Sequence, residues 1–268
     1  MLPGLVCIVL ASAAATLVWI LSLITHEYSW TDRIWSLAPI CYAWVFAGAA
    51  HLRDARLDVV AILITLWGVR LTFNFARKGG YARGGEDYRW GVLRERMRPR
   101  QFAIFDLAFI AGYQNVIIVL ITLPMWSMSD HRVRFGATDV ALSVLALLAI
   151  IGETVADQQQ WRFQQQKKAV IESGRQPEQR FLRTGLFRYS RHPNFFCELS
   201  FWWLVFLFAV SAARTFLLPT MAGSVLLTLL FVGSARFTES ISARRYPEYA
   251  GYQHETSAVL PWLSKAKP

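Results

Sequence analysis

The sequence predicts an all-α, polytopic membrane protein with seven transmembrane helices, an external N-terminus and a cytosolic C-terminus. Hydrophobic residues make up 54% of the 268 residues. They are gathered into long blocks, and lysine and arginine are concentrated in alternate loops. A helix rises about 1.5 Å per residue, so about twenty apolar residues cross the hydrocarbon core of a bilayer. No internal repeat or low-complexity linker divides the chain, and we expect residues 1–268 to form a single integral-membrane domain.

Seven apolar segments account for the predicted spans. The first exceeds the core of a signal peptide and has no basic residue before it, so we expect it to remain as a helix. The second is the shortest. The fifth becomes polar at Glu153, and the pattern that follows predicts a helix continuing into water. In order, the expected spans are 4–25, 35–50, 57–76, 102–128, 137–156, 195–213 and 215–235.

Lysine and arginine are divided unevenly between the two sides that seven spans define. One side carries 22 of the 28, the other carries five, and Arg70 lies inside the third span. Because cytosolic loops hold the lysine and arginine excess, we place the 22-charge side and the C-terminus in the cytosol. The net charge of +10 then reflects topology and an anionic partner, with no indication of nucleic-acid binding. A short tail and few cytosolic cysteines favour a bacterial inner membrane.

The three cysteines, Cys7, Cys41 and Cys197, all fall within apolar spans. They form no CxxC pair, and no histidine cluster accompanies them. The sequence therefore predicts neither a disulfide framework nor a metal site. The expected partners are membrane lipids and a lipophilic substrate drawn from the bilayer.

The strongest local signal is GLFRYSRHPNFFCE at residues 185–198. Asn194 and Glu198 are four residues apart, which places them on one face at the start of a membrane helix. A carboxylate inside a membrane is costly, and its default interpretation is functional. The alternative is that Glu198 pairs with an arginine of a neighbouring helix and only locks the bundle.

This motif resembles the C-terminal motif of the steroid 5α-reductase superfamily, roughly GLF-x-Y-x-x-x-x-N-Y/F-x-x-E. The tail TESISARRYPEYAGYQHETSAVLPW and the segments DRIWSLAP and GGEDYRWG are similar to a bacterial steroid-reductase-like branch, formerly a domain family of unknown function. The resemblance runs from about Asp32 to Trp262. Isoprenylcysteine and phospholipid methyltransferases have a similar RHPxY…E element and EYxxY tail.

The resemblance implies an enzyme that binds NADPH from the cytosolic side and reduces an activated C=C bond in a lipid. Asn194 and Glu198 match the family's cofactor residues, whereas Glu153 stands where the family has Asn. From the residues themselves, arginines recognise phosphate through bidentate hydrogen bonds. The candidate cofactor-binding residues are Asn194, Glu198, Asp157, Arg236, Tyr189, Arg191, Tyr252, Arg70 and Glu153.

The acid that would polarise the substrate carbonyl is a point of departure from the family. Its tyrosine on the third helix aligns with Trp67, whose indole N–H donates a hydrogen bond but not a proton. The family's Gln-Glu pair falls on Asp32 and Arg33. Apolar surroundings could keep Asp32 protonated by disfavouring its charge, and the rival interpretation is a structural ion pair with Arg33. The candidate catalytic residues are Asp32 and Trp67.

Two other functions remain open at this point. One is an S-adenosylmethionine-dependent methyltransferase acting on a lipid or a prenylated cysteine. The other is a membrane scaffold or lipid-binding protein, which leaves the intramembrane carboxylates unexplained. The glycine-rich loop GGYARGG follows no strand, so it is not a Rossmann phosphate loop, and we interpret it as a mobile lid.

Overall fold

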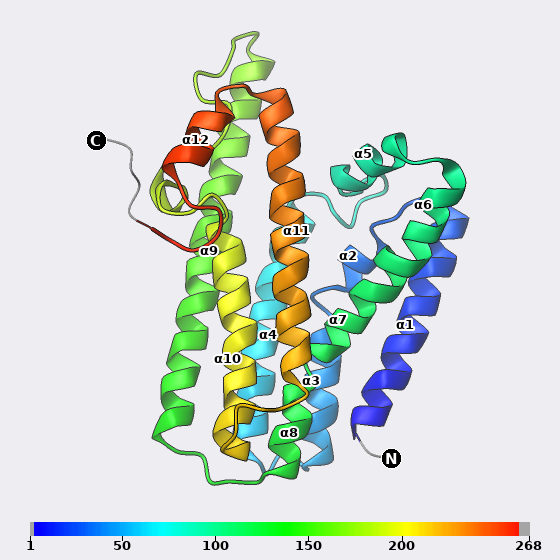
Figure 1. Cartoon of the computed structure of the whole chain (residues 1–268), viewed down its shortest axis with the longest axis vertical. Coiled ribbons are helices and arrows are strands. Elements are labelled where there is room, and N and C mark those ends of the chain that lie inside the picture. The colour runs from blue at the N-terminus through cyan, green and yellow to red at the C-terminus, as the bar shows by residue number, and fades with distance from the viewer. Residues whose placement is uncertain (1–2, 263–268) are drawn as a thin grey trace. The chain divides into compact units, whose positions relative to one another are not determined.

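The computed structural model describes residues 3–262, which form helices joined by turns and contain no β-strand (Figure 1). The all-α prediction is confirmed. The elements are α1 (Pro3–Thr25), α2 (Trp30–Ile34), α3 (Ala38–Ala49), α4 (Ala55–Arg77), α5 (Tyr88–Arg96), α6 (Pro99–Phe105), the π-helix η1 (Asp106–Tyr113), α7 (Gln114–Leu120), α8 (Pro124–Asp130), α9 (Ala137–Glu172), the 3₁₀ turn η2 (Gly185–Arg188), α10 (Pro193–Ala213), α11 (Met221–Arg245) and α12 (Tyr249–Glu255).

Six helical segments among the described residues are long and apolar enough to cross a bilayer. They are Pro3–Thr25, Ala55–Arg77, Pro99–Asp130, Ala137–Glu172, Pro193–Ala213 and Met221–Arg245. The predicted second span, 35–50, instead holds α3, whose twelve residues extend only about 18 Å. A bilayer core is about 30 Å thick, so α3 by itself covers only part of it. The six long segments support a multi-pass membrane protein.

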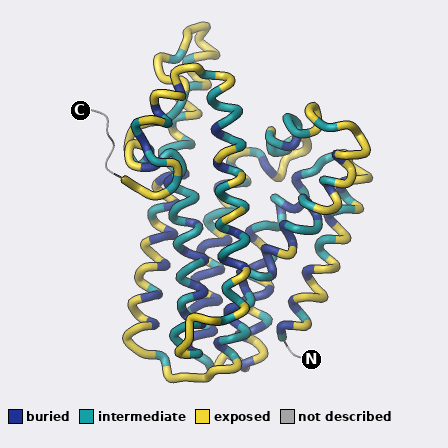
Figure 2. Tube along the Cα trace, viewed as in Figure 1, coloured by how far each residue is buried: buried dark blue, intermediate teal, exposed yellow. Residues whose placement is uncertain are grey.

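The outward faces of these helices carry large apolar side chains. Leu17 is 57% exposed on α1, Phe73 is 64% exposed on α4 and Leu229 is 60% exposed on α11, and Figure 2 shows exposed positions recurring along the helices. Exposed apolar surface on this scale is unfavourable in water and favourable against lipid tails. The surfaces therefore match a lipid environment.

The chain divides into two compact units. The first comprises Met1–Ala146 and Trp202–Leu227, and the second comprises Leu147–Phe201 and Thr228–Pro268. Helices α9, α10 and α11 each contribute residues to both.

A buried ion pair fastens helices of the first unit. Arg56 Nε and Nη2 donate to the two carboxylate oxygens of Asp139 at 2.7 and 2.8 Å, and both side chains are almost fully buried. Arg56 also donates to the carbonyl of Val133. This bidentate geometry joins the start of α4 to the start of α9, since a planar guanidinium matches a carboxylate.

Close helix approach organises the second unit. A Cβ added at Gly152 of α9 would lie 2.8 Å from Cys197 Sγ of α10, so a larger residue would force the thiol or a helix to shift. Glu153 and Glu198 directly follow these two residues in the chain. The two buried carboxylates therefore adjoin this helix contact.

Candidate functional site

The GLF turn of the second unit is shaped by one glycine and held by two hydrogen bonds to its backbone. Gly185 has φ +63°, a left-handed conformation that favours glycine. The amide of Leu186 donates to Gln159 Oε1 at 3.0 Å, which ties the turn to α9. The Tyr252 hydroxyl of α12 donates to the carbonyl of Phe187 at 2.5 Å. The turn thus takes its position from α9 on one side and from the tail on the other.

Arg191 and Glu239 form the centre of a buried polar network. Arg191 Nε and Nη2 donate to the Glu239 carboxylate at 2.7 and 3.0 Å. Its Nη1 donates to the carbonyls of Gln253 and Thr256. Glu239 also accepts from Gln253 Nε2 at 2.8 Å, and His192 Nε2 lies 3.0 Å from it. Every guanidinium nitrogen of Arg191 is engaged within the protein.

The backbone completes the attachment of residues 189–192 to the tail. The amides of Arg191 and His192 donate to the carbonyls of Ser257 and Ala258, at 2.9 and 3.0 Å, and the amide of Trp262 donates to Tyr189 O. The loop before α10 and the segment after α12 are therefore joined to each other by backbone hydrogen bonds.

Sequence reasoning missed Glu239. It lies three residues after Arg236 in a helix apolar enough to span a membrane, and it is 7% exposed. Like Glu198, Glu239 is a carboxylate within an apolar helix and hence a functional candidate. Its partner Arg191 is 48 residues away in the chain, a separation that no local pattern reveals.

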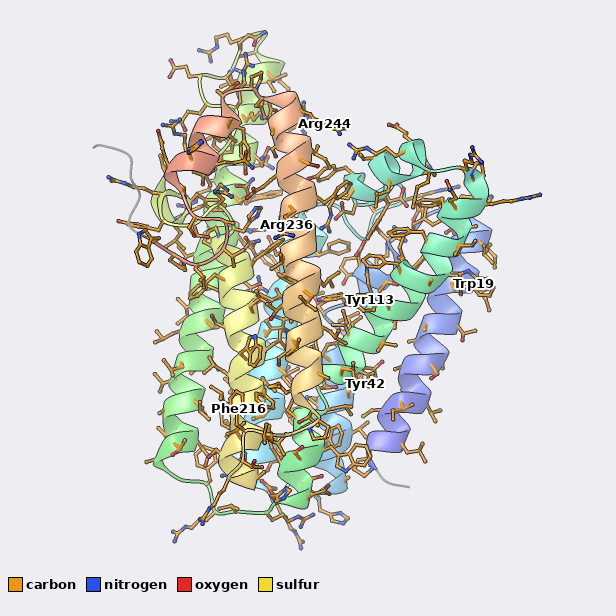
Figure 3. The ribbon with its side chains drawn as sticks, in the orientation of Figure 1. Trp19, Tyr42, Tyr113, Phe216, Arg236 and Arg244 are labelled. Carbon is orange, nitrogen blue, oxygen red and sulfur yellow. The ribbon has the colours of Figure 1, made fainter. Side chains whose placement is uncertain are left out.

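Eight of the nine candidate cofactor residues lie in the second unit. Glu153, Asp157 and Glu198 are buried, Asn194 is half-buried, and Tyr189 and Arg236 are exposed. Figure 3 shows Arg236 on α11. The ninth candidate, Arg70, lies on α4 in the first unit. The buried carboxylates thus belong to α9, which bonds the GLF turn through Gln159, and to α10, which follows that turn in the chain.

The two candidate catalytic residues lie in the first unit. Asp32 Oδ2 accepts a hydrogen bond from Trp90 Nε1 at 2.8 Å. Burial, with the neighbouring Asp87 carboxylate, raises the pKa of Asp32. Trp67 is fully buried and packs edge-to-face on Trp202, with ring centroids 4.8 Å apart. Trp67 is therefore part of the packed core, and its catalytic role stays a prediction.

The rival interpretation of Asp32 as the ion-pair partner of Arg33 is wrong. Arg33 Nη2 bonds Glu27 at 2.6 Å, and its Nε donates to the carbonyl of Gly80. Glu27 lies six residues before Arg33, in the turn after α1. This turn brings the Glu27 carboxylate to Arg33, a contact that the adjacency of Asp32 and Arg33 in the sequence does not reveal.

The glycine-rich loop is fastened to the same turn rather than free. The amide of Gly84 donates to Glu27 Oε1 at 2.9 Å, and the amide of Asp87 donates to Ser29 Oγ at 2.9 Å. Glu86 Oε1 accepts from the amide of Tyr28 at 2.5 Å. These three bonds attach the loop that the sequence predicts to be a mobile lid.

Comparison with known proteins places the chain in a family. Residues 18–256 match the family described as "Protein of unknown function (DUF1295)". The chain belongs to the DUF1295 family. The match includes every candidate residue from Asp32 to Tyr252. A relative described as "Uncharacterized protein C594.04c" of Schizosaccharomyces pombe is 33% identical over 280 residues, covering 97% of this chain and 80% of its own. No solved structure matches the chain significantly.

Proposed function

We propose that this DUF1295 protein is an NADPH-dependent membrane reductase of the activated C=C bond of a steroid-like or other lipophilic enone. The observation that carries the proposal is the cluster of buried carboxylates on α9 and α10 beside the GLF turn. Their positions are those of cofactor residues in the steroid 5α-reductase superfamily, which the 185–198 motif resembles. The bound cofactor would supply a hydride to the β-carbon of the enone.

The chemistry of the side chains fits this cofactor. The carboxylates of Glu153, Asp157 and Glu198 can accept hydrogen bonds from ribose hydroxyls and a carboxamide. The Asn194 amide both donates and accepts. The exposed guanidinium of Arg236 can pair with phosphate.

Arg191 and Tyr252 take a positioning role in this proposal. Their polar groups already bond Glu239 and the carbonyl of Phe187, and they hold the segment that leads into Asn194. Tyr189 remains a candidate for direct contact, because the residue is 42% exposed. Arg70 remains a candidate for phosphate.

Asp32 is proposed as the acid. A protonated carboxyl can donate a hydrogen bond to the substrate carbonyl and deliver its proton to the α-carbon, which balances the hydride added at the β-carbon. The Trp90 bond would hold the carboxyl in one orientation. Trp67 is proposed to contribute only a hydrogen bond.

A lipid methyltransferase using S-adenosylmethionine is the second candidate. The similar RHPxY…E element and EYxxY tail support it, and buried carboxylates suit the positive sulfonium of that cofactor. The exposed arginines near the GLF turn favour the more phosphorylated NADPH.

We further propose seven spans, with α3 as a short one, an external N-terminus and a cytosolic C-terminus and cofactor site in a bacterial inner membrane. The 22-to-5 division of lysine and arginine supports this arrangement. A reporter fused after Lys267, which lies outside the described residues, should then read cytosolic, and one near His131 should read external. A periplasmic C-terminus would contradict the topology.

The reductase proposal is tested by following a labelled hydride. The purified protein is incubated with NADPH deuterated at C4 and a lipophilic 4-en-3-one, and the product is examined by mass spectrometry. We expect one deuterium at the β-carbon and a solvent-derived proton at the α-carbon. A reduced product whose β-hydrogen comes from solvent would refute hydride transfer from NADPH.

A further inference from the structure

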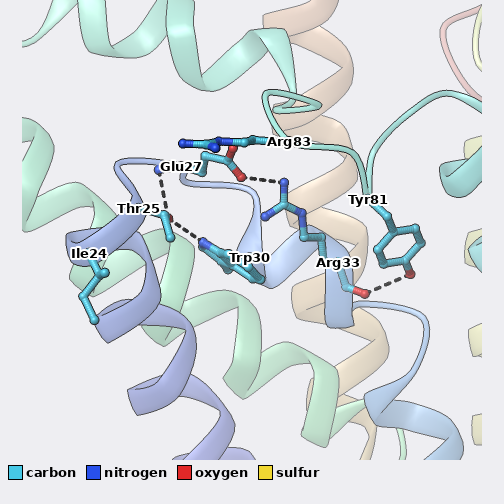
Figure 4. A pocket seen from close by; sticks show the side chains of 7 residues that line it. All are labelled: Ile24, Thr25, Glu27, Trp30, Arg33, Tyr81 and Arg83. Atoms are coloured by element: carbon cyan, nitrogen blue, oxygen red, sulfur yellow. Dashed lines mark hydrogen bonds and ion pairs between the residues drawn. The ribbon is translucent and has the colours of Figure 1, made fainter.

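A pocket of about 460 Å³ lies at the end of α1, within the first unit. Figure 4 shows that its walls come from the last turn of α1, the start of α2 and the glycine-rich loop. The 23 residues of α1 extend about 35 Å, slightly more than the hydrocarbon core. The pocket therefore lies where acyl chains meet headgroups. Its lining residues are Ile24, Thr25, Glu27, Trp30, Arg33, Tyr81 and Arg83.

The charges of the pocket leave one arginine without a bonded partner. Glu27 and Arg33 neutralise each other through their 2.6 Å ion pair. The bond from the Gly84 amide, together with Arg33, lowers the pKa of Glu27, which stays ionised. The charge of Arg83 also lowers the pKa of Glu27, but the Arg83 guanidinium makes no hydrogen bond or ion pair within residues 3–262. The lining thus has one net positive charge, carried by an exposed side chain.

One lining residue of the pocket, Ile24, belongs to an apolar stripe of α1. Ile24 is 70% exposed, and Ile20 and Leu17 lie four and seven residues before it, also exposed. This spacing puts the three side chains on one face of α1. Trp30 also lines the pocket, and its indole N–H is bonded to Thr25 Oγ1 at 2.8 Å, as suits an interfacial tryptophan. A pocket of net positive charge that adjoins an apolar stripe matches a phosphate that carries an acyl chain.

We propose that this pocket binds the headgroup of an anionic phospholipid, with the phosphodiester on Arg83 and an acyl chain along Ile24, Ile20 and Leu17. The pocket's single net positive charge complements one phosphodiester. A headgroup ammonium would find the Glu27 carboxylate already bonded to Arg33 and Gly84. A hydroxylated headgroup has an acceptor in Tyr81, whose hydroxyl donates to Arg33 O and keeps its lone pairs. Phosphatidylglycerol is a lipid with this chemistry.

The test measures which lipid the protein retains. The full chain is reconstituted in vesicles of equal parts phosphatidylglycerol and phosphatidylcholine, extracted in mild detergent, and analysed by native mass spectrometry. We expect the parent to retain phosphatidylglycerol preferentially. Arg83→Gln should reduce that preference roughly tenfold, because a charge-assisted hydrogen bond to phosphate is lost. Arg100→Gln, an equal charge change at an exposed residue outside the pocket, should keep it.

Folding does not confound this comparison, since Arg83 bonds no described residue and Arg83→Gln should unfold at the parent's temperature. Equal lipid preference in the parent and Arg83→Gln would overturn the site, as would an equal loss in Arg100→Gln. Displacement of the retained lipid by inorganic phosphate would assign Arg83 to a free anion. Displacement by NADPH would assign it to the nucleotide. Either displacement would overturn the lipid assignment.

Discussion

Asp32→Asn should slow reduction of an enone by about 10²–10⁴-fold, the effect typical of a lost general acid, while NADPH affinity stays unchanged. Asparagine can still accept the hydrogen bond from Trp90 Nε1 and can still donate one to a substrate carbonyl. It has no proton to transfer. The substitution therefore separates proton delivery from positioning. Single-turnover reduction with saturating NADPH is the measurement.

The pH dependence of this rate has a defined sign. Burial and the Asp87 carboxylate raise the pKa of Asp32, so its protonated form persists to higher pH than an ordinary aspartic acid. The rate should fall as pH rises through that pKa, and Asp32→Asn should lose this limb. Glu95→Gln, an exposed acid of α5, is the matched control. An unchanged rate in Asp32→Asn would move the search to Tyr42, Tyr88 and Tyr113, of which Figure 3 labels the first and last.

Glu198→Gln and Asn194→Ala should each weaken NADPH binding by about tenfold to a hundredfold. A hydrogen bond to a buried charged group contributes about 1.5–3 kcal/mol, and 1.36 kcal/mol is a factor of ten. Both residues lie on one face of the first turns of α10. Fluorescence titration of NADPH against the detergent-solubilised variants measures the change.

The control for this pair is Glu178→Gln, which removes an exposed carboxylate of the same unit. It should bind NADPH as the parent does. Parental affinity in both Glu198→Gln and Asn194→Ala would show that the family correspondence fails at its best-matched positions.

The long helices could be predicted because they coincide with the hydrophobic blocks of the sequence. The span expected at 57–76 is α4, and Asp54 caps it by accepting from the amides of Arg56 and Leu57. The span predicted at 35–50 matches the observed helix less closely. A turn separates α2 from α3, which begins at Ala38 with Pro39 in its first turn. Proline favours that position, and it leaves too few helical residues for a full span.

The polar contacts could not be predicted in the same way. Periodicity places Glu198 and Asn194 on one face, but it does not say that Arg191 bonds Glu239 or that Arg33 bonds Glu27. Such pairs depend on how turns bring distant segments together, and the sequence carries no local signal of that approach. The carboxylates within apolar segments are the part of the site that the sequence alone could reveal, because a charge in a membrane is costly.

The most direct test is thermal unfolding of the detergent-solubilised protein with NADPH, with S-adenosylmethionine and without ligand. A ligand at about a hundred times its dissociation constant stabilises the folded state by about 2.7 kcal/mol. We expect NADPH to raise the unfolding temperature, S-adenosylmethionine to leave it unchanged, and Glu198→Gln to diminish the NADPH effect. Stabilisation by S-adenosylmethionine with none by NADPH would contradict the reductase assignment.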